Sequence, residues 1–319
     1  MGRNNMALKF LVGDIGGTKT ELALTSDGII FERTEIFQSM NHQSLEEIIT
    51  SFLVRDEVLG ACFGIAGPVK GGVCSTTNLP WIIDAKKINK QFGFSKTLII
   101  NDLEATAYGV KILAPDKRYT LWQGQKDTKC NQAIISPGTG LGEALVIYND
   151  GKMIPVASEG GHSDFAPRNN NEIDLFQYLK GKYGRVSCER VLSGNGLSDI
   201  YSFLSKGIKK QPGEISKEAL ASELSVDRKA VRWFCEILGA EAGNLVLSSC
   251  ALGGVFIGGG IAPKILEIIK EEDFLIGFFD KGRFSHYLKK VSVQVILDFQ
   301  VNMRGAAFFF LNQQKDEFS

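Results

Sequence analysis

The sequence predicts an α/β fold built from a duplicated domain. Two segments, residues 10–28 and 133–151, carry the same order of features: an apolar strand, a Gly/Thr turn, a second strand and an Asp-Gly turn. Around them, short apolar runs alternate with stretches of helical spacing, which is typical of α/β proteins. Two glycine-rich hairpins in one chain indicate a duplication in which each copy offers backbone N–H groups to phosphate.

The first unit is expected to alternate strands and helices. Apolar runs and alternation predict its strands, helical spacing predicts its helices, and Gly, Pro, Asn and Asp residues mark the turns. The expected strands are 8–12, 20–24, 29–33, 61–66, 73–77 and 98–100, and the expected helices are 45–53, 84–92 and 103–113.

The second unit is expected to begin with a strand at 119–122 and the second glycine hairpin. Helices follow at 172–183 and 228–250, and a buried strand within 253–263 runs into three glycines. The tail, 302–313, has small and apolar residues at helical spacing and could return to pack on the first unit. We therefore expect a small domain of residues 1–113 plus 302–319 and a large domain of residues 114–301.

Composition excludes several functions. The chain has 319 residues, 44% of them hydrophobic, enough for a large core in two domains. Its 36 basic residues balance 36 acidic ones, so neither nucleic acid nor an anionic membrane is expected as a partner. The six cysteines lack C-x-x-C spacing, which favours reduced thiols in the cytoplasm, and no apolar run is long enough to cross a bilayer.

The glycine hairpins do not fit the common dinucleotide or P-loop motifs. Those motifs place a helix after their glycines, whereas here a strand follows each turn. Asp14 stands directly before the first turn, and because carboxylate and phosphate repel each other, this arrangement favours a divalent cation between them, held through its waters. The alternative is two ordinary hairpins that need glycine for a positive φ.

Asp102 is the candidate general base. It follows the strand at 98–100, and functional groups of open α/β sheets usually lie at the carboxyl ends of strands. The alternative is that Asp102 caps the following helix. Asn101 could cap the same helix, with Glu104 completing a box-like pattern, and this would leave Asp102 available for chemistry.

A second set of polar residues suits a polyol. Glu159 and His162 flank two glycines, and their hydrogen-bonding groups fit neighbouring hydroxyls better than a metal, since no second His or Cys lies at ligand spacing. A polar loop with a satisfied histidine is the alternative. Glu189, on an expected short helix, would alone most often pair with Arg190 or Arg185. The glycines 258–260 could accommodate an adenosine or simply form a tight turn.

Together these motifs resemble the bacterial glucokinase family of the hexokinase, Hsp70 and actin ATPase superfamily. The resemblance extends from Asp14-Ile-Gly-Gly-Thr18 through Ile100-Asn-Asp102, Pro137-Gly-Thr-Gly-Leu-Gly142, Glu159-Gly-Gly-His162 and Ser187–Gly194 to Gly258-Gly-Gly260. It implies two α/β domains of the actin-like ATPase (ribonuclease H-like) fold around a cleft, with ATP and magnesium on the larger domain and sugar between the two. The order of these motifs is specific, although no single glycine turn is.

The resemblance also implies roles for individual residues. Asp102 would accept the proton of the sugar 6-hydroxyl as it attacks the γ-phosphoryl group of ATP, with the other hydroxyls held by Asn101, Glu159, His162 and Glu189. Asp14 would help to place magnesium. The phosphates and the adenosine would be met by Gly16, Gly17, Thr18, Gly138, Thr139, Gly140, Gly258, Gly259 and Gly260.

Some features depart from related families and some alternatives remain. The cysteine-rich zinc motif of the related sugar kinase and repressor family is missing, so no structural zinc is expected. Ser136 stands where glycine is common, and Asn195 where proline is common. The alternatives to a glucokinase are a kinase for another hexose or an N-acetylhexosamine, a non-catalytic sugar-binding regulator, and a chaperone or filament ATPase. The sequence is silent on oligomeric state; a homodimer is the assembly we considered.

Overall fold

The computed structural model describes residues 9–76, 79–125 and 129–315. The chain forms two compact units, Met1–Leu113 with Gln300–Ser319 and Ala114–Phe299. Residues 8 and 77, at the ends of two expected strands, lie outside the described residues.

The first unit holds a five-stranded sheet in the order β3-β2-β1-β4-β8. β1 pairs antiparallel with β2 and parallel with β4, which in turn is parallel to β8. The elements in chain order are β1 (Phe10–Ile15), β2 (Lys19–Thr25), β3 (Arg33–Gln38), α1 (Leu45–Leu53), β4 (Gly60–Ile65), β5 (Val69–Lys70), β6 (Val73–Ser75), β7 (Ile82–Asp84), α2 (Ala85–Phe92), β8 (Lys96–Asn101), α3 (Asp102–Ile112) and α12 (Val301–Lys315).

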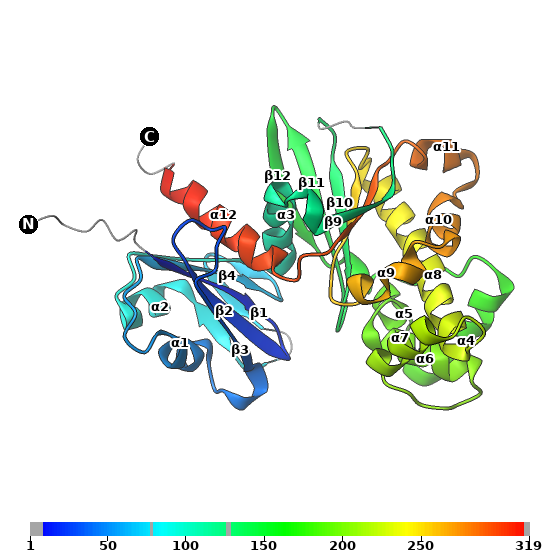
Figure 1. Cartoon of the computed structure of the whole chain (residues 1–319), viewed down its shortest axis with the longest axis horizontal. Coiled ribbons are helices and arrows are strands. Elements are labelled where there is room, and N and C mark those ends of the chain that lie inside the picture. Colours follow the sequence, from blue (N-terminus) through cyan, green and yellow to red (C-terminus); the bar gives the residue numbers. More distant parts are fainter. Residues whose placement is uncertain (1–8, 77–78, 126–128, 316–319) are drawn as a thin grey trace, which may run out of the picture. The chain divides into compact units, whose positions relative to one another are not determined.

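The C-terminal helix α12 belongs to this first unit, as its apolar spacing suggested. It packs against α3, β4 and β1 (Figure 1). Met303, Ala306, Ala307 and Phe310 are buried there, and the Phe310 ring stacks on Phe10. α12 therefore places residues of the last part of the chain beside β1, the first strand of the first glycine hairpin.

The expected strand at 29–33 is wrong. These residues form a turn, and β3 begins only at Arg33. The Asp27 carboxylate accepts hydrogen bonds from the backbone N–H groups of Ile29 and Ile30, and Gly28 has a φ of +74°. An aspartate that binds the backbone two residues on forms an Asx-turn, which here overrides the strand preference of two isoleucines that are left exposed.

The second unit holds a six-stranded sheet in the order β12-β11-β10-β13-β14-β9. Its strands are β9 (Arg118–Trp122), β10 (Gln132–Pro137), β11 (Leu141–Asn149), β12 (Lys152–Ser158), β13 (Val255–Ile257) and β14 (Val293–Ile296). Its α-helices are α4 (Asn170–Tyr183), α5 (Cys188–Val191), α6 (Gly194–Leu204), α7 (Pro212–Ala221), α8 (Val226–Ser249), α9 (Leu266–Ile269), α10 (Glu272–Phe279) and α11 (Ser285–Leu288).

The two glycine hairpins occupy equivalent places in the two sheets. In the first unit β1 lies between its antiparallel hairpin partner β2 and the parallel strand β4. In the second unit β10 lies between its hairpin partner β11 and the parallel strand β13. The duplication expected from the sequence is thus present in the topology.

Among the described residues, no helix is both long and apolar enough to span a membrane. The six cysteines are free thiols, four of them buried.

Candidate active site

Asp102 is the first residue of α3, immediately after β8. Asn101 is the N-cap: its side-chain oxygen accepts hydrogen bonds from the N–H groups of Leu103 (2.9 Å) and Glu104 (3.3 Å). The Asn101 amide also donates to the Gly67 carbonyl at 3.1 Å, which fixes the cap in place. Asp102 Oδ1 accepts from the Leu103 N–H at 2.9 Å. Asn101 is therefore the N-cap residue, and it satisfies the N–H groups of both Leu103 and Glu104.

Asp14 lies on β1 in a cluster of acidic groups. Burial, the charge of Asp102 and, more weakly, that of Glu21 raise the pKa of Asp14 to about 7, although Lys19 opposes this rise. Asn302 of α12 donates a hydrogen bond to Asp14 Oδ1 at 2.8 Å. Asp102 is therefore near enough for its charge to affect Asp14.

The sequence reasoning missed three polar residues of this cluster. Glu21 pairs with Asp14 in the register of β1 and β2 and is buried, and its Oε1 accepts a hydrogen bond from Gln300 Nε2 at 3.0 Å. Asn302 reaches Asp14 from α12. In the sequence Glu21 resembles any polar residue of an alternating strand. Gln300 and Asn302 are almost three hundred residues away from their partners, and no local pattern marks them.

The acidic cluster fits a hydrated magnesium ion. Mg²⁺ prefers carboxylate oxygens and keeps several waters. A cation beside Asp14 would favour its charged form, against the burial and, to a smaller extent, the Asp102 charge that raise its pKa. Within the described parts of the chain, no three Asp, Glu, His or Cys side chains converge on a metal position. The residues present therefore suit an ion held mainly by water and by substrate phosphates.

The turn glycines do not serve to adopt a positive φ. Gly16, Gly17, Gly138 and Gly140 all lie outside the left-handed region, so the alternative of ordinary hairpins that need glycine for that purpose does not hold. The first turn is closed by the Gly16 N–H, which donates to the Lys19 carbonyl at 3.0 Å. The second turn is closed by the Gly138 N–H, which donates to the Gly140 carbonyl at 2.8 Å.

The threonines of both turns, Thr18 and Thr139, are exposed. Each turn therefore presents a short polar side chain to solvent beside backbone that a phosphate could approach.

Glu189 lies against the second turn. A Cβ on Gly140 would come 2.4 Å from Glu189 Oε2, and the same oxygen accepts a hydrogen bond from the Leu141 N–H at 3.0 Å. Its other oxygen, Oε1, is 3.9 Å from His162 Nδ1. The surface pair with a neighbouring arginine, considered from the sequence, does not form. Glu189 instead lies between the second glycine turn, where it binds the Leu141 N–H, and His162 of the expected sugar loop.

The loop from Glu159 to His162 forms one turn of 3₁₀-helix, η3 (Gly160–His162). Both Glu159 and His162 are exposed at its ends. The two glycines between them lie close to β11. A Cβ on Gly161 would lie 2.1 Å from the Leu141 carbonyl oxygen, and one on Gly160 would lie 2.1 Å from Glu143 Oε2.

Gly258, Gly259 and Gly260 follow β13 and lie beside the second glycine turn. Gly259 has a φ of +76°, and a Cβ there would come 2.2 Å from the Pro137 carbonyl oxygen. The Ile261 N–H donates to that same oxygen at 3.3 Å. Gly259 and Gly260 are exposed. The structure thus brings the expected adenosine turn next to the expected phosphate turn.

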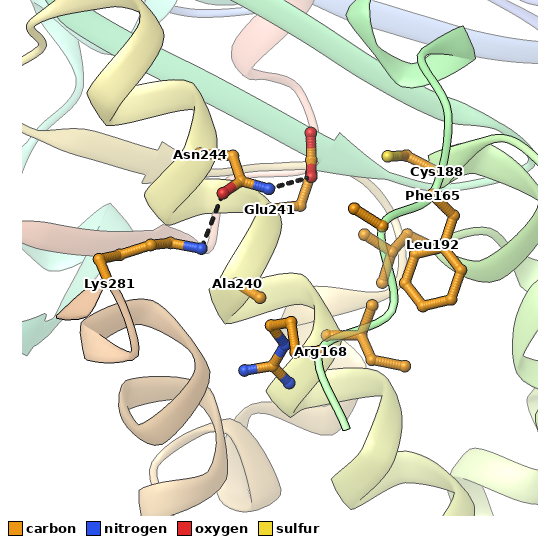
Figure 2. Close-up of a pocket in the computed structure, with 10 residues that line it drawn as sticks. Phe165, Arg168, Cys188, Leu192, Ala240, Glu241, Asn244 and Lys281 are labelled. Carbon is orange, nitrogen blue, oxygen red and sulfur yellow. Dashed lines mark hydrogen bonds between the residues drawn. The ribbon is translucent and has the colours of Figure 1, made fainter. Parts of the chain in front are cut away.

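A small cavity of about 100 Å³ lies in the second unit between α8 and the segment that follows the sugar loop. Figure 2 shows Asn244 donating to Glu241 (2.9 Å) and accepting from Lys281 (2.7 Å) on one side of it, with Cys188 opposite. Burial lowers the pKa of Lys281 and raises the pKa of Cys188 to about 12. None of the predicted site residues lines this cavity.

Each unit thus gathers its own part of the predicted site. The first brings together Asp14, Asn101, Asp102 and the turn at Gly16–Thr18. The second brings together Glu189, His162 and the glycine turns at 138–140 and 258–260. The fold and these paired glycine hairpins define the chain as an α/β protein of the actin-like ATPase fold.

Comparison with known proteins gives the family. The family model described as Glucokinase matches residues 11–313. A curated glucokinase of Nostoc punctiforme is 38% identical, over 93% of this chain and 97% of its own length. The crystal structure of a glucokinase from an Antarctic psychrotroph has a TM-score of 0.81 at 32% identity, covering 95% of this chain and 99% of that one. The chain belongs to the glucokinase family.

A more distant structure shares the fold. It is a ROK family glucokinase from Streptomyces griseus in complex with glucose and AMPPNP, with a TM-score of 0.68 at 19% identity, covering 94% of this chain and 98% of that one.

Proposed function

We propose that this protein is an ATP-dependent glucokinase, which transfers the γ-phosphoryl group of ATP to the 6-hydroxyl of glucose and gives glucose 6-phosphate and ADP. The observation that carries the proposal is the position of the Asp102 carboxylate. It stands at the end of β8 while Asn101 caps α3, and the chain belongs to a family of sugar kinases. A carboxylate at the carboxyl end of a strand, next to the residue that caps the helix, stands where a general base is needed.

Asp102 accepts the proton of the sugar 6-hydroxyl as that oxygen attacks phosphorus. Asn101, Glu159, His162 and Glu189 bind the remaining hydroxyls, since carboxylates and imidazole accept and donate to neighbouring OH groups. The His162–Glu189 contact of 3.9 Å supports a shared role for these two residues. Phosphoryl transfer depends mainly on positioning and charge neutralisation, so a fixed base and fixed sugar contacts supply much of the catalysis.

Both glycine turns bind the phosphates of ATP through backbone N–H groups, joined by Thr18 and Thr139, and the turn at Gly258–Gly260 accommodates the adenosine. Asp14, whose carboxylate accepts a hydrogen bond from Asn302, would bind the waters of a magnesium ion. Magnesium, when bound with the nucleotide, neutralises phosphate charge. The binding of an ATP analogue and glucose by the S. griseus relative supports this pair of ligands.

We also propose the partners, the cellular location and the oligomeric state of the enzyme. A small sugar and ATP are the partners, with no nucleic acid and no structural zinc. The even charge balance and the free cysteines support a cytoplasmic enzyme. A homodimer is the assembly to be tested.

The test is a direct measurement of product. Purified protein is incubated with glucose, mannose, fructose and an N-acetylhexosamine, each with ATP, ADP or polyphosphate as donor and with magnesium, and sugar phosphate is quantified. We expect glucose 6-phosphate from ATP to form fastest. A higher kcat/KM for another sugar would assign the enzyme to that sugar, and no product from any sugar would overturn the kinase assignment.

A further inference from the structure

Glu143 is a buried carboxyl group for which the mechanism above has no use. It lies on β11, only 3% exposed, and its Oε1 has no hydrogen-bond partner. A buried polar atom without a partner costs free energy, so its retention calls for an explanation.

The position of Glu143 links it to the sugar loop. Oε2 lies so close to Gly160 that a Cβ there would be 2.1 Å away. In the register of β11 and β12, Glu143 pairs with Ser158, whose hydroxyl accepts a hydrogen bond from the Gly160 N–H at 2.9 Å. The Glu143 side chain therefore supports η3 from beneath, between the two sugar-binding candidates Glu159 and His162.

The groups that face Glu143 determine its charge. Glu241 approaches from α8 and Cys188 from α5, while Lys281 lies beyond Glu241 and donates its hydrogen bond to Asn244. Burial, with a smaller contribution from Glu241, raises the pKa of Glu143 to about 7. Near pH 6 Glu143 is therefore neutral, and above pH 7 it acquires a charge in a buried place that already faces an acid.

We propose that Glu143 is a positioning residue for sugar binding, which in its neutral form holds the loop Glu159–His162 in the arrangement that binds the hexose. Ionised Glu143 repels Glu241 and draws water toward Gly160, and this displaces the loop. The inference rests on the proposed function, because it assigns Glu143 an effect on a sugar site.

The sharpest variant is Glu143→Gln, which has the shape of the neutral acid at every pH. In the wild type we expect the KM for glucose to rise by about tenfold between pH 6.5 and 8.5, as a group with a pKa near 7 loses its proton. In Glu143→Gln the KM for glucose should stay within about twofold over that range. The KM for ATP serves as the internal reference, since Glu143 does not contact the nucleotide turns.

Glu143→Ala tests whether the Glu143 side chain holds the loop Glu159–His162 in place through its contact with Gly160. Without a side chain beneath Gly160, the KM for glucose should rise about tenfold at every pH, with a matching loss of glucose affinity by calorimetry. Thermal unfolding of each variant shows whether it folds, and Glu143→Gln keeps the proposal testable if Glu143→Ala does not.

Two outcomes would overturn the proposal: a wild-type glucose KM that does not change with pH, or an equally steep rise in Glu143→Gln. The second would show that the pH dependence arises from a group other than Glu143. Formation of glucose 6-phosphate by the wild type at pH 6.5 tests the kinase assignment separately, so failure of one does not imply failure of the other.

Discussion

Replacing Asp14 by asparagine should stabilise the protein at neutral pH while removing the carboxylate that we propose helps to place magnesium. The pKa of Asp14 is raised from 3.8 to about 7, first by burial and then by Asp102. Each pH unit of such a difference corresponds to about 1.4 kcal/mol. Ionised Asp14 therefore lowers the free energy of unfolding by about 4 kcal/mol above pH 7.

The sign follows from proton binding. Between about pH 4 and pH 7 the folded protein holds a proton on Asp14 that the unfolded chain has released, so this group makes stability fall as pH rises through that window. Asp14→Asn has no such proton and keeps an oxygen for Asn302 to bond. The variant should match the wild type near pH 4 and exceed it by about 4 kcal/mol at pH 8.

Urea unfolding followed by circular dichroism from pH 4 to pH 8, without magnesium, measures the difference. Asp27→Asn is the matched control: backbone N–H groups of Ile30 and Ile29 lower the pKa of Asp27, so this carboxyl titrates below the pH range of the experiment, and the difference between this variant and the wild type should stay nearly constant from pH 4 to pH 8. A difference between Asp14→Asn and the wild type that is the same at pH 4 and pH 8 would refute the reasoning.

Three further changes test the site in the second unit. Gly161→Ala places a methyl group 2.1 Å from the Leu141 carbonyl oxygen, so it should displace the sugar loop and raise the KM for glucose at least about tenfold; a normal KM would show that the loop does not determine sugar binding. Gly181→Ala, a glycine with open space around its Cβ position in α4, is its control and should leave the KM unchanged. Glu189→Gln retains the shape that packs on Gly140 but loses the charge near His162, so glucose affinity measured by calorimetry should fall about tenfold while nucleotide affinity changes little; an equal loss of both affinities would contradict its assignment to the sugar.

Much of the fold could be predicted because its signals are local. The strands before each glycine turn, the capped helix after Asn101 and the long helix α8 follow from apolar spacing and capping residues. The misplaced strand at 29–33 shows the limit of such signals. Ile29 and Ile30 have strong strand preference, but the Asp27 carboxylate binds their N–H groups and holds them in a turn.

The candidate site could be predicted only where its residues stand in compact motifs. Asp14, Asp102 and the loop at 159–162 stand beside glycines or at strand ends, and these patterns are visible in the sequence. Asn302, Gln300 and Glu143 act through partners brought near by the sheet register or by the return of α12. The close contact of the glycines at 160 and 161 with β11 likewise depends on tertiary structure that no local pattern marks.

The most direct test of the account is the turnover of Asp102→Asn. Asn101 accepts from the N–H groups of Leu103 and Glu104, and an asparagine at 102 keeps an oxygen for the Leu103 N–H, so the substitution leaves the helix intact while removing the proton acceptor. The account predicts that kcat for glucose 6-phosphate formation falls by about a thousandfold, while the Kd for glucose measured by calorimetry changes by no more than a few-fold. A variant that binds glucose and phosphorylates it at the wild-type rate would contradict the role of Asp102 as general base.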